Sequence, residues 1–566
     1  MAESRPWHVH YPDGVAAWPE FEAITLSKAL QRTTARFPGK TALYYMGKKI
    51  SYRGLNRRVG RFAAALKKLG VGVGDKVALL LPNIPQMVVA NFAVWRLGAV
   101  TTPNNPLYTE RELVHQLNDA EASVLVALDL LMPRVQKILP QTAVRDVIVC
   151  HLNDDLPFPK NRLFPLVKKS MYRAITPQGH LHLFTGLLRQ VTEEETEDRS
   201  EWDRLAALLY TGGTTGVSKG VMLTHANLSS NVQQIKMWFY DLRDGEGSML
   251  AVFPFFHAAG FTAIQGSCVF SGLTDVLVPR PEPTVIIDIM KKAKPQFVPG
   301  VPTIYVGLLN NPLFRQLDHG HVRAFTAGAA PLPLETIQDL KKLTGKGIIN
   351  VYGLTESSAM ATATPVAGID KPETVGVPLP ATDIRIVDLE DGTREIAAGE
   401  AGEVVIKGPQ IMQGYYNRPE DTAAVLRDGW LHTGDIGRMD AEGFLTLVDR
   451  KKDMIIASGY NVYPNEIDGV LYDHPDVLEA CTIGVPDAYR GETVKIFVVP
   501  KQGASLGKED LIAFCRSRLA AYKVPRQVAF IDELPKSAVG KILRRKLRER
   551  EEEEGQPKGA SNEAKR

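Results

Sequence analysis

Short apolar runs alternate with helical patterns along the first part of the chain. Apolar residues recur with helical spacing over 52–69 and 109–118, which predicts two amphipathic helices. Continuous apolar runs at 76–81, 123–128 and 146–150 predict buried strands. Strands and helices that alternate in this way predict an α/β fold with mainly parallel sheets covered by helices on both faces.

The later part of the chain has a different pattern. Two short alternating runs, at 383–387 and 403–407, predict antiparallel strands of a small β-barrel-like subdomain. After Arg450, helical and strand patterns form a compact set with its own apolar faces, with helices expected at 466–472 and 509–519 and strands at 478–484 and 494–499. We therefore expect a large N-terminal domain at 1–450, a small mobile α+β lid domain at 451–548 and a disordered charged tail at 549–566.

Two unusual stretches have alternative interpretations. The run 247–274 contains no Asp, Glu, Lys or Arg and is long enough to span a bilayer, but its Pro254, His257 and Gln265 favour a buried strand and helix beside an apolar cavity. The stretch from Lys160 to Arg173 mixes basic and apolar residues. It is either an interfacial membrane segment or a solvated amphipathic insertion.

Composition narrows the classes of protein. The chain has 566 residues, of which 44% are hydrophobic and 23% charged, which excludes a mostly disordered chain and a multi-span membrane protein. Its 67 basic and 64 acidic residues give a net charge of +3 and no case for nucleic-acid binding. Four cysteines without CxxC spacing predict neither a zinc site nor a disulfide framework, and they fit a reducing cytosol.

A glycine- and threonine-rich loop follows an apolar strand pattern at 205–210. Its sequence, TGGTTGVSKG, supplies backbone N–H groups, hydroxyl groups and one cation, a composition suited to a triphosphate. The residues concerned are Thr211, Gly212, Gly213, Thr214, Thr215, Gly216 and Lys219. The loop differs from a Walker A loop because Ser218 precedes the lysine. Taken alone, it could equally be a surface turn.

The sequence around this loop resembles a known family. YTGGTTGVSKGVMLTHANL is similar to the signature of AMP-forming acyl-activating enzymes, with Gly213 where many members have Ser. NNPLYTERELVHQLNDAEA, DRKKDMIIASGYNVYPNEID and LPKSAVGKILRRKLR resemble the bacterial long-chain fatty-acid–CoA ligases of that superfamily. The motifs occur in the family's order from Thr211 to Lys541.

The resemblance implies roles for residues in the N-terminal domain. His257 of FPFFHAAG would lie beside the acyl carboxylate, although a histidine in an apolar run is more often a core residue. Thr355 would bind phosphate, and Glu356 would help to hold Mg²⁺, a hard cation that prefers oxygen ligands. The adenine base would lie among Ala329, Ala330, Tyr352 and Gly353.

Further roles fall near the domain junction and in the lid domain. Asp435 and Arg450 would contact the ribose, and Lys452 would be the hinge. Gly459 belongs to the loop that would meet CoA, and Lys541 would neutralise the attacking carboxylate and the α-phosphate. Outside the resemblance, we interpret the neighbours of that lysine as surface charge: Arg544, Arg545 and Lys546.

These roles predict an ATP-dependent ligase that converts a medium- or long-chain fatty acid into acyl-CoA through an acyl-adenylate. The apolar run 247–274, with Phe261 near the entrance, and the helix 228–240 are candidates for the acyl pocket. The hypothesis uses ATP, Mg²⁺ and CoA, needs no nucleic acid, and admits a homodimer. It places the protein in the cytoplasm and admits peripheral contact with the inner membrane face through the stretch from Lys160 to Arg173. An aryl-CoA ligase, a fatty-acyl-AMP ligase and a non-catalytic acyl- or nucleotide-binding protein remain alternatives, as does a peripheral membrane-binding structural protein.

Overall fold

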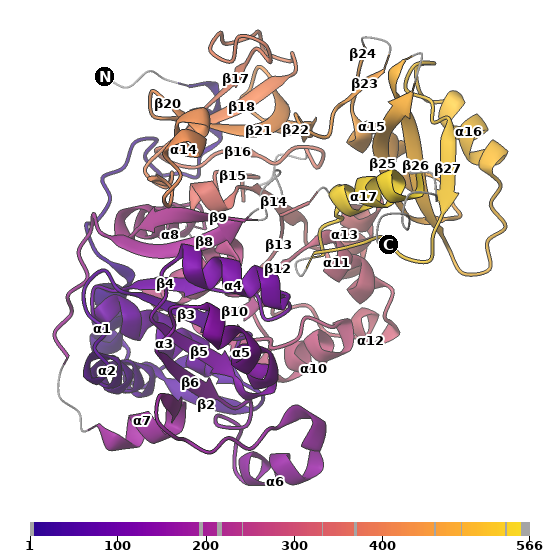
Figure 1. Ribbon diagram of the computed structural model, residues 1–566. Helices are drawn as coiled ribbons and strands as arrows, with labels where there is room; N and C mark the ends of the chain where they lie inside the picture. The colour runs from indigo at the N-terminus through magenta and orange to yellow at the C-terminus, as the bar shows by residue number, and fades with distance from the viewer. Residues whose placement is uncertain are drawn as a thin grey trace, which may run out of the picture. The chain divides into compact units, whose positions relative to one another are not determined.

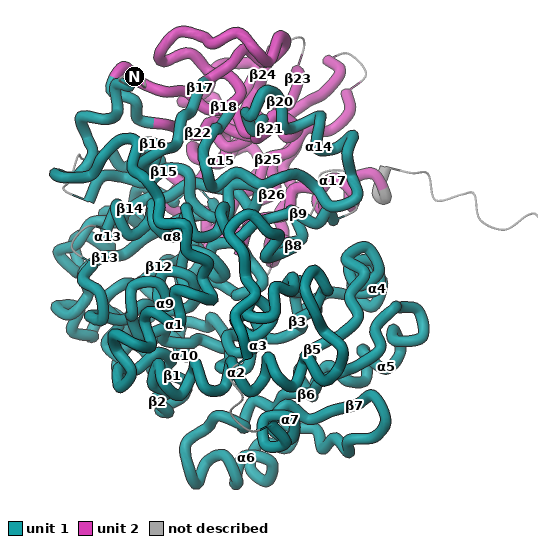
Figure 2. The backbone as a smooth tube through the Cα atoms, turned by 90° about the vertical axis from the view of Figure 1, so that its left-hand side faces the viewer, with its two compact units in different colours: residues 1–385, 405–432, 442–444 teal, residues 386–404, 433–441, 445–566 magenta. Residues whose placement is uncertain are grey.

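The chain forms two compact units in the computed structural model (Figure 2). The structure describes residues 5–191, 196–211, 218–239, 242–330, 332–366, 371–457, 460–487, 490–537 and 540–555, the side chains of 553–555 excepted. Unit 1 comprises Met1–Arg385, Val405–His432 and Glu442–Phe444. Unit 2 comprises Ile386–Val404, Thr433–Ala441 and Leu445–Arg566, so it includes segments that precede the predicted boundary at 450.

The first large sheet of unit 1 has eight strands in the order β19-β9-β8-β4-β3-β5-β6-β7 (Figure 1). Its strands from β8 to β7 pair in parallel, and β9 and β19 are antiparallel at one edge. The strands are β3 (Lys76–Leu80), β4 (Val100–Pro103), β5 (Val124–Leu128), β6 (Asp146–Cys150), β7 (Leu181–Leu183), β8 (Leu205–Thr211), β9 (Lys219–Thr224) and β19 (Gly414–Tyr415). The predicted strands at 76–81, 123–128, 146–150 and 205–210 are thereby confirmed.

The second large sheet has nine strands in the order β16-β15-β14-β13-β12-β10-β11-β1-β2. Its centre is parallel, from β14 to β1, and both edges are antiparallel. The strands are β1 (Thr41–Tyr45), β2 (Lys48–Ser51), β10 (Ser248–Ala251), β11 (Thr274–Leu277), β12 (Phe297–Gly300), β13 (Ala324–Ala327), β14 (Ile348–Tyr352), β15 (Thr362–Ala363) and β16 (Val377–Pro378).

Helices of two kinds accompany these sheets (Figure 1). Amphipathic helices keep one polar face in solvent, as in α2 (Tyr52–Lys68) and α4 (Glu110–Asp119), which confirm the predicted helices. The helix α4 begins with a capping box in which Thr109 and Glu112 satisfy each other's backbone N–H groups. By contrast, every residue of α3 (Pro85–Arg96) is buried. The other helices of unit 1 are α1 (Leu26–Arg36), α5 (Met132–Ile138), α6 (Lys160–Val167), α7 (Phe184–Gln190), α8 (His225–Trp238), α9 (Ser267–Ser271), α10 (Pro283–Ala293), α11 (Pro302–Leu309), α12 (Pro312–Arg315), α13 (Leu334–Thr344) and α14 (Pro419–Val425).

The uncharged run at 247–274 forms a strand and two helical segments, as expected. The strand is β10, and η5 (Ala259–Gly266) is a π-helix that continues into α9. Among the described residues, no helix combines the length and apolar character needed to cross a membrane. The run belongs to unit 1, where β10 pairs with β11 and β12 inside the nine-stranded sheet.

A smaller sheet of five strands contains residues of both units. Its order is β17-β18-β21-β20, and β22 pairs with β21. The strands are β17 (Asp383–Val387), β18 (Gly402–Lys407), β20 (Leu426–Arg427), β21 (Trp430–Met439) and β22 (Leu445–Arg450). β21 is antiparallel to both β20 and β22. The strands expected at 383–387 and 403–407 are present, whereas their closure into a barrel stays a prediction.

Most of unit 2 is a five-stranded sheet covered by helices. The order is β24-β23-β26-β25 with β27 paired to β26, and its elements include β23 (Ile455–Ala457), β24 (Tyr460–Val462), β25 (Val477–Asp487), β26 (Gly491–Pro500), β27 (Gln527–Phe530), α15 (Pro464–Tyr472), α16 (Lys508–Arg516) and α17 (Arg544–Gly555). Ile467, Val494 and Leu511 belong to one apolar core between this sheet and its helices. The prediction that disorder begins at 549 is wrong for the first part of the tail, because α17 continues to Gly555. Ion pairs of Arg545 with Glu549, at 3.1 Å, and of Lys495 with Glu551 stabilise this extension.

Candidate active site

The ends of the predicted phosphate loop are fixed by a β-hairpin. Thr211 at the end of β8 lies directly opposite Lys219 at the start of β9 in the antiparallel register. The Lys219 ammonium contacts the Asp421 carboxylate at 2.5 Å and lies 5.2 Å from the centre of the Tyr415 ring. The predicted loop residues Gly212, Gly213, Thr214, Thr215 and Gly216 lie outside the described residues.

Tyr415 connects this hairpin to the predicted metal ligand. The strand β19 brings Tyr415 opposite Val221 of β9. The Tyr415 hydroxyl donates a hydrogen bond of 2.9 Å to Oε1 of Glu356. Burial and the neighbouring Glu356 charge raise the pKa of Tyr415 above its ordinary value, so the hydroxyl keeps its proton and remains a donor. Tyr415 was not predicted from the sequence, because only the pairing of β19 with β9 places it near both Lys219 and Glu356.

Glu356 and Thr355 lie on a short helical turn, η6 (Thr355–Ser357), directly after β14. The backbone carbonyl of Glu356 accepts a hydrogen bond of 2.9 Å from the Met412 amide. The Glu356 backbone is thus held by the segment before β19, and one oxygen of its carboxylate is oriented by Tyr415. A single carboxylate fixed in this way suits Mg²⁺, which proteins often bind through one or two carboxylates together with phosphate oxygens of a substrate.

The predicted adenine-binding residues follow two adjacent parallel strands. Ala329 and Ala330 come after β13, and Tyr352 and Gly353 come at the end of β14, so the four residues meet at the carboxyl edge of the nine-stranded sheet. Ligands of parallel α/β sheets bind at this edge. Ala329 adopts a left-handed backbone conformation with φ of 69°. A Cβ atom at Gly353 would lie only 1.9 Å from the Ala359 carbonyl oxygen, so only glycine fits there.

His257 lies between β10 and η5, in a segment that is fixed by hydrogen bonds to its backbone. The Asn83 side chain donates to the carbonyl oxygens of Ala251 and Phe253 at 2.9 and 2.8 Å, and this buried amide fixes the segment that leads to His257. The Ala259 amide donates to Nδ1 of His257 at 3.3 Å. A neutral His257 ring that accepts at Nδ1 carries its proton at Nε2, so it presents a donor at that atom.

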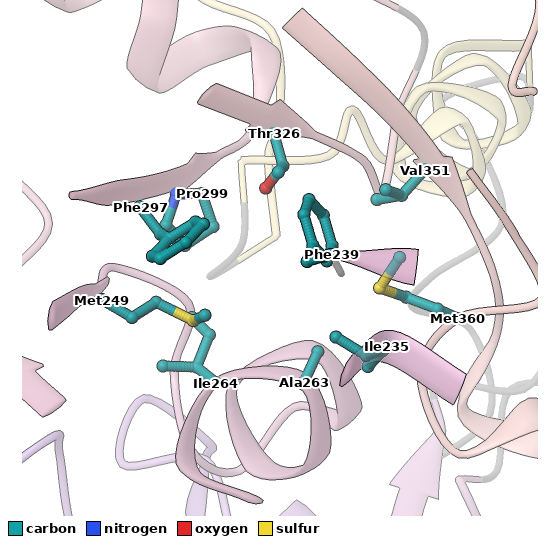
Figure 3. A pocket seen from close by; sticks show the side chains of 10 residues that line it. All are labelled: Ile235, Phe239, Met249, Ala263, Ile264, Phe297, Pro299, Thr326, Val351 and Met360. Atoms are coloured by element: carbon teal, nitrogen blue, oxygen red, sulfur yellow. The ribbon is translucent and has the colours of Figure 1, made fainter. Parts of the chain in front are cut away.

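An apolar cavity of about 50 Å³ lies within unit 1 (Figure 3). Both sequence candidates for the acyl pocket contribute to its wall: the run 247–274 through Met249, Ala263 and Ile264, and helix α8 through Ile235. The remaining lining residues are Phe239, Phe297, Pro299, Thr326, Val351 and Met360. Figure 3 shows the Thr326 side chain directed into the space from the sheet and Ala263 directed into it from the π-helix.

Phe261 does not line this cavity, in contrast to its predicted position near the entrance. It is fully buried and packs edge-on against Trp95, with ring centres 5.3 Å apart. The π-helical turn explains the difference, because it presents Ala263 and Ile264 to the cavity and directs Phe261 to the core.

Four predicted residues of unit 2 come together around one positive side chain. Asp435 of β21 lies opposite Arg450 of β22, with the Asp435 carboxylate 3.3 Å from Nε of Arg450. Burial and the positive charges of Arg450 and Lys452 lower the pKa of Lys541 to about 7, against the opposing charge of Asp435. The ammonium of Lys541 is therefore easily deprotonated until a further anion arrives.

A small hairpin presents this lysine. Lys536 and Ile542 form an antiparallel bridge, and the Lys541 amide donates to the Ser537 hydroxyl at 3.1 Å. Gly540 adopts a φ of 74°, a left-handed conformation that favours glycine. Gly459, the predicted CoA-contacting residue, lies outside the described residues.

Arg544, at the start of α17, is a half-buried ion-pair partner and not the exposed surface charge predicted from sequence. Its guanidinium donates to the Asp468 carboxylate and to the Asn465 side chain, each at 2.6 Å. It also lies 3.8 Å from Asp449. The prediction failed because these partners precede Arg544 by many residues and come together only in the folded unit. Arg545 and Lys546 are exposed, as expected.

The fold has two large, mainly parallel sheets, and candidate adenine-binding residues lie at the carboxyl edge of one of them. Together with the hairpin that carries Lys541, these features are typical of an α/β enzyme of the adenylate-forming class. The chain belongs to the AMP-binding enzyme family: residues 30–416 match the family model of that description, and residues 466–541 match the model of the AMP-binding enzyme C-terminal domain.

Relatives of known name cover nearly the whole chain. A long-chain-fatty-acid–CoA ligase of Bacillus subtilis is 44% identical over 98% of this chain and 99% of its own length. A feruloyl-CoA synthase of an Amycolatopsis species is 34% identical over 95% of this chain and 99% of its own length. The crystal structure of ATP-bound MatB from Rhodopseudomonas palustris has a TM-score of 0.82 and 31% identity, covering 94% of this chain and all of the other.

Proposed function

We propose that the protein is an ATP-dependent long-chain fatty-acid–CoA ligase. A fatty carboxylate attacks the α-phosphate of ATP to give acyl-adenylate and pyrophosphate, and the thiol of CoA then attacks the adenylate carbonyl to give acyl-CoA and AMP. The name of the Bacillus subtilis relative, at 44% identity, supports fatty acids over the aromatic acid in the name of the 34% relative. The apolar cavity within unit 1 supports the same choice, because an acyl chain needs an apolar wall.

The geometry around Lys541 is the observation that supports this chemistry most. The first step joins two anions, so positive charge must offset their repulsion. Lys541 lies in the field of Arg450 and Asp435, which we propose as the ribose contacts. Bound carboxylate and phosphate would raise the pKa of Lys541 and make its ammonium a partner of the reacting oxygens.

We assign the remaining roles to residues of unit 1. Thr211, Lys219 and Thr355 bind phosphate oxygens, and the Nε2 proton of His257 faces the acyl carboxylate. Glu356, oriented by Tyr415, holds Mg²⁺, which supplies charge neutralisation at the phosphates when it is bound. Adenine lies against Tyr352, Gly353 and the two alanines after β13.

The second step needs a different set of chain residues. We propose that the C-terminal domain turns about Lys452 between the two half-reactions and brings the loop around Gly459 to CoA. Lys452 is an exposed residue of the turn between Arg450 and Asp453, where a change of backbone angles would disturb little packing. Gating of successive steps by a small domain is a common use of hinge motion.

The same proposal places the enzyme in the cytoplasm, in peripheral contact with the inner membrane face through the stretch from Lys160 to Arg173. Exposed apolar side chains, such as Leu166 and Val167, and exposed basic side chains, such as Lys168 and Lys169, support the contact. Association into a homodimer stays a prediction, which sedimentation equilibrium of the purified chain tests.

Separate assays of the two half-reactions test the assignment. Lys541→Ala should lower fatty-acid-dependent ATP–pyrophosphate exchange by about a hundredfold or more, because one charged partner of the transition state is lost. Thioester formation from supplied acyl-adenylate and CoA should persist. Lys546→Ala, which removes an exposed lysine of the same segment, is the matched control and should keep both activities. Full exchange activity in Lys541→Ala would contradict the proposal.

A substrate panel tests the acid. Pyrophosphate release should rise from acetate to palmitate and oleate and should depend on CoA for turnover. Activity restricted to aromatic acids would favour the aryl-CoA ligase, and acyl-adenylate accumulation that CoA does not consume would favour the fatty-acyl-AMP ligase.

A further inference from the structure

Helix α8 carries a row of buried amide side chains on one face. Asn227, Asn231 and Gln234 follow one another at intervals of four and three residues, which places them on one side of the helix. Their exposed fractions are 9%, 0% and 0%. Burial of an amide is unfavourable unless its donors and acceptors are bonded, so the partners of this row identify its role. Those partners lie in the segment 409–412 and in the turn 356–360.

Asn231 holds the backbone of Met360 at both of its polar groups. The Met360 amide donates to Oδ1 of Asn231 at 3.1 Å, and Nδ2 of Asn231 donates to the Met360 carbonyl oxygen at 2.7 Å. Met360 lies four residues after Glu356, and its side chain lines the apolar cavity together with Ile235 of α8 (Figure 3). Asn231 therefore fixes a residue of the cavity wall that also ends the turn of the proposed metal ligand.

A second path of hydrogen bonds reaches the same turn through Gln410. Nδ2 of Asn231 also donates to Oε1 of Gln234 at 2.9 Å, and Nε2 of Gln234 donates to Oε1 of Gln410 at 3.1 Å. The carbonyl oxygen of Gln410 accepts a hydrogen bond of 2.8 Å from the Ser358 hydroxyl. Gln410 and Ser358 are both fully buried. One connected set of side chains therefore holds the turn at Ser358 and at Met360.

The segment 409–412 joins this network to the proposed metal ligand itself. Nδ2 of Asn227 donates to two backbone carbonyl oxygens of the segment, each at 2.8 Å. At the end of the segment, the Met412 amide donates to the Glu356 carbonyl oxygen at 2.9 Å. The chain then continues into Tyr415, whose hydroxyl orients the Glu356 carboxylate. The amides of α8 thus fix both the backbone that carries this carboxylate and the segment that leads to its hydrogen-bond donor.

We propose that Asn231 is a positioning residue for two parts of the active site. It sets the Glu356 carboxylate for Mg²⁺, and it sets the Met360 wall of the cavity for the acyl chain. The inference deepens the proposed function, and it rests on that function for the roles of Glu356 and of the cavity. An apolar helix face would pack as densely, but directed hydrogen bonds hold a carboxylate within the small tolerance that a metal site needs.

Calorimetric binding of α,β-methylene-ATP to the full-length protein tests the metal side of the inference without turnover. Asn231→Ala should weaken binding by about tenfold in the presence of Mg²⁺, the effect expected when a metal ligand loses its orientation. With EDTA in place of Mg²⁺, the variant and the wild type should bind equally, because Asn231 acts through Glu356. Ser358→Ala, a smaller change at the other attachment of the turn, should show the same Mg²⁺-dependent loss.

The chain-length preference tests the cavity side of the inference. Asn231→Ala should move the ratio of kcat/KM for palmitate over octanoate toward one, because Met360 is no longer fixed in the wall. Ser358→Ala should keep the wild-type ratio, because Asn231 still holds Met360 in that variant. Partial unfolding would lower only the active fraction and would alter neither this ratio nor the Mg²⁺-dependent affinity. The two measurements therefore separate a positioning role from a structural one.

Gln233→Ala is the matched control on the same helix. Gln233 is 6% exposed and holds the backbone of Glu22 as Asn231 holds that of Met360. Its Oε1 accepts from the Glu22 amide at 2.9 Å, and its Nε2 donates to the Glu22 carbonyl oxygen at 3.0 Å. This variant loses an equivalent pair of hydrogen bonds away from the turn, so it should keep the wild-type affinity and the wild-type ratio.

The outcomes that contradict the inference are distinct from those that contradict the proposed function. Unchanged Mg²⁺-dependent affinity in Asn231→Ala would overturn the inference, and if that variant does not fold, unchanged affinity in Ser358→Ala would do so. Equal losses in Gln233→Ala, or wild-type binding that does not respond to Mg²⁺, would also overturn it. A wild-type protein that shows Mg²⁺-dependent binding but makes no acyl-CoA would contradict the proposed function alone.

Discussion

The guanidinium of Arg544 donates a 2.6 Å hydrogen bond to the carboxylate of Asp468, inside unit 2 and two residues after the hairpin of Lys541. Asp468 lies on α15 and Arg544 begins α17, so the pair joins two helices of one unit. Burial outweighs the attraction of Arg544 and raises the pKa of Asp468 to about 6. This ion pair therefore holds the C-terminal helix, and with it the base of the lysine hairpin.

Loss of the Arg544 side chain should destabilise α17. Arg544→Ala leaves Asp468 buried without its cation, a change that costs about 3–5 kcal/mol when the carboxylate stays charged. Hydrogen exchange of the α17 backbone amides measures the loss locally. The double variant Arg544→Ala with Asp468→Asn removes the unpaired charge and should recover much of the protection. A double variant no more protected than the single one would contradict this account.

The same pair predicts a pH dependence with a definite sign. The pKa of Asp468 is higher in the folded protein than the ordinary value of 3.8, so the folded state binds more protons and stability falls as pH rises from about 4 through 6. In Arg544→Ala the pKa of Asp468 should rise further, so the variant's penalty should be smaller at pH 5 than at pH 8. Protection of α17 in Asp468→Asn should lack this dependence, and its persistence there would assign it to another group.

Catalysis should depend on the protonation of Lys541. Burial and the charge of Arg450 lower the pKa of this lysine to about 7 in the free enzyme. The adenylation value of kcat/KM, which reports the free enzyme, should therefore fall as pH rises above about 7. Lys541→Arg keeps its charge, so whatever activity remains should lose that falling limb. An unchanged limb in the arginine variant would contradict the assignment.

Tyr415 should support magnesium binding through its hydrogen bond to Glu356. Tyr415→Phe removes the donor that orients the carboxylate and should raise the Mg²⁺ concentration for half-maximal activity by about tenfold. Tyr416→Phe is the control, since its hydroxyl contacts the exposed Glu121 at 3.3 Å and not Glu356. Titration of activity with Mg²⁺ at saturating ATP measures both variants, and equal responses would contradict the role of Tyr415.

The volume of the cavity should set the preferred chain length. Ala263→Phe fills part of the space and should lower the ratio of kcat/KM for palmitate over octanoate by about tenfold. Phe239→Ala enlarges the same space and should move the ratio in the opposite direction. Equal ratios in the two variants, with unchanged melting temperatures, would show that the acyl chain lies elsewhere.

Local patterns predicted most elements of the fold. The strand at 146–150 agrees with β6 at both ends, because a short apolar run between turns has one stable environment, the interior of a parallel sheet. The uncharged run at 247–274 was correctly separated from a membrane span by its proline and polar residues. The order of the motifs identified the candidate residues. The structure adds that Asp435 and Arg450 form an ion pair and that both charges act on the pKa of Lys541.

Contacts between distant segments could not be predicted from local patterns in the sequence. Tyr415, Asn83 and Arg544 each act on a residue far away along the chain, and no local period reports such a partner. The buried position of Phe261 was missed for a different reason. Its environment depends on the width of one helical turn, and a pattern of apolar residues alone does not distinguish a π-helix from an α-helix.

A change in the length of the π-helix η5 would change which side chains line the cavity. Successive residues of an α-helix are turned by about 100°, and a π-helix is turned less per residue, so a deletion within Ala259–Gly266 would rotate every later side chain into a new direction. Such a deletion would exchange the side chains that face the cavity without any substitution of the residues that remain. Differences of length in this one helix are therefore a route by which related chains can acquire different acids as substrates, independent of point substitutions.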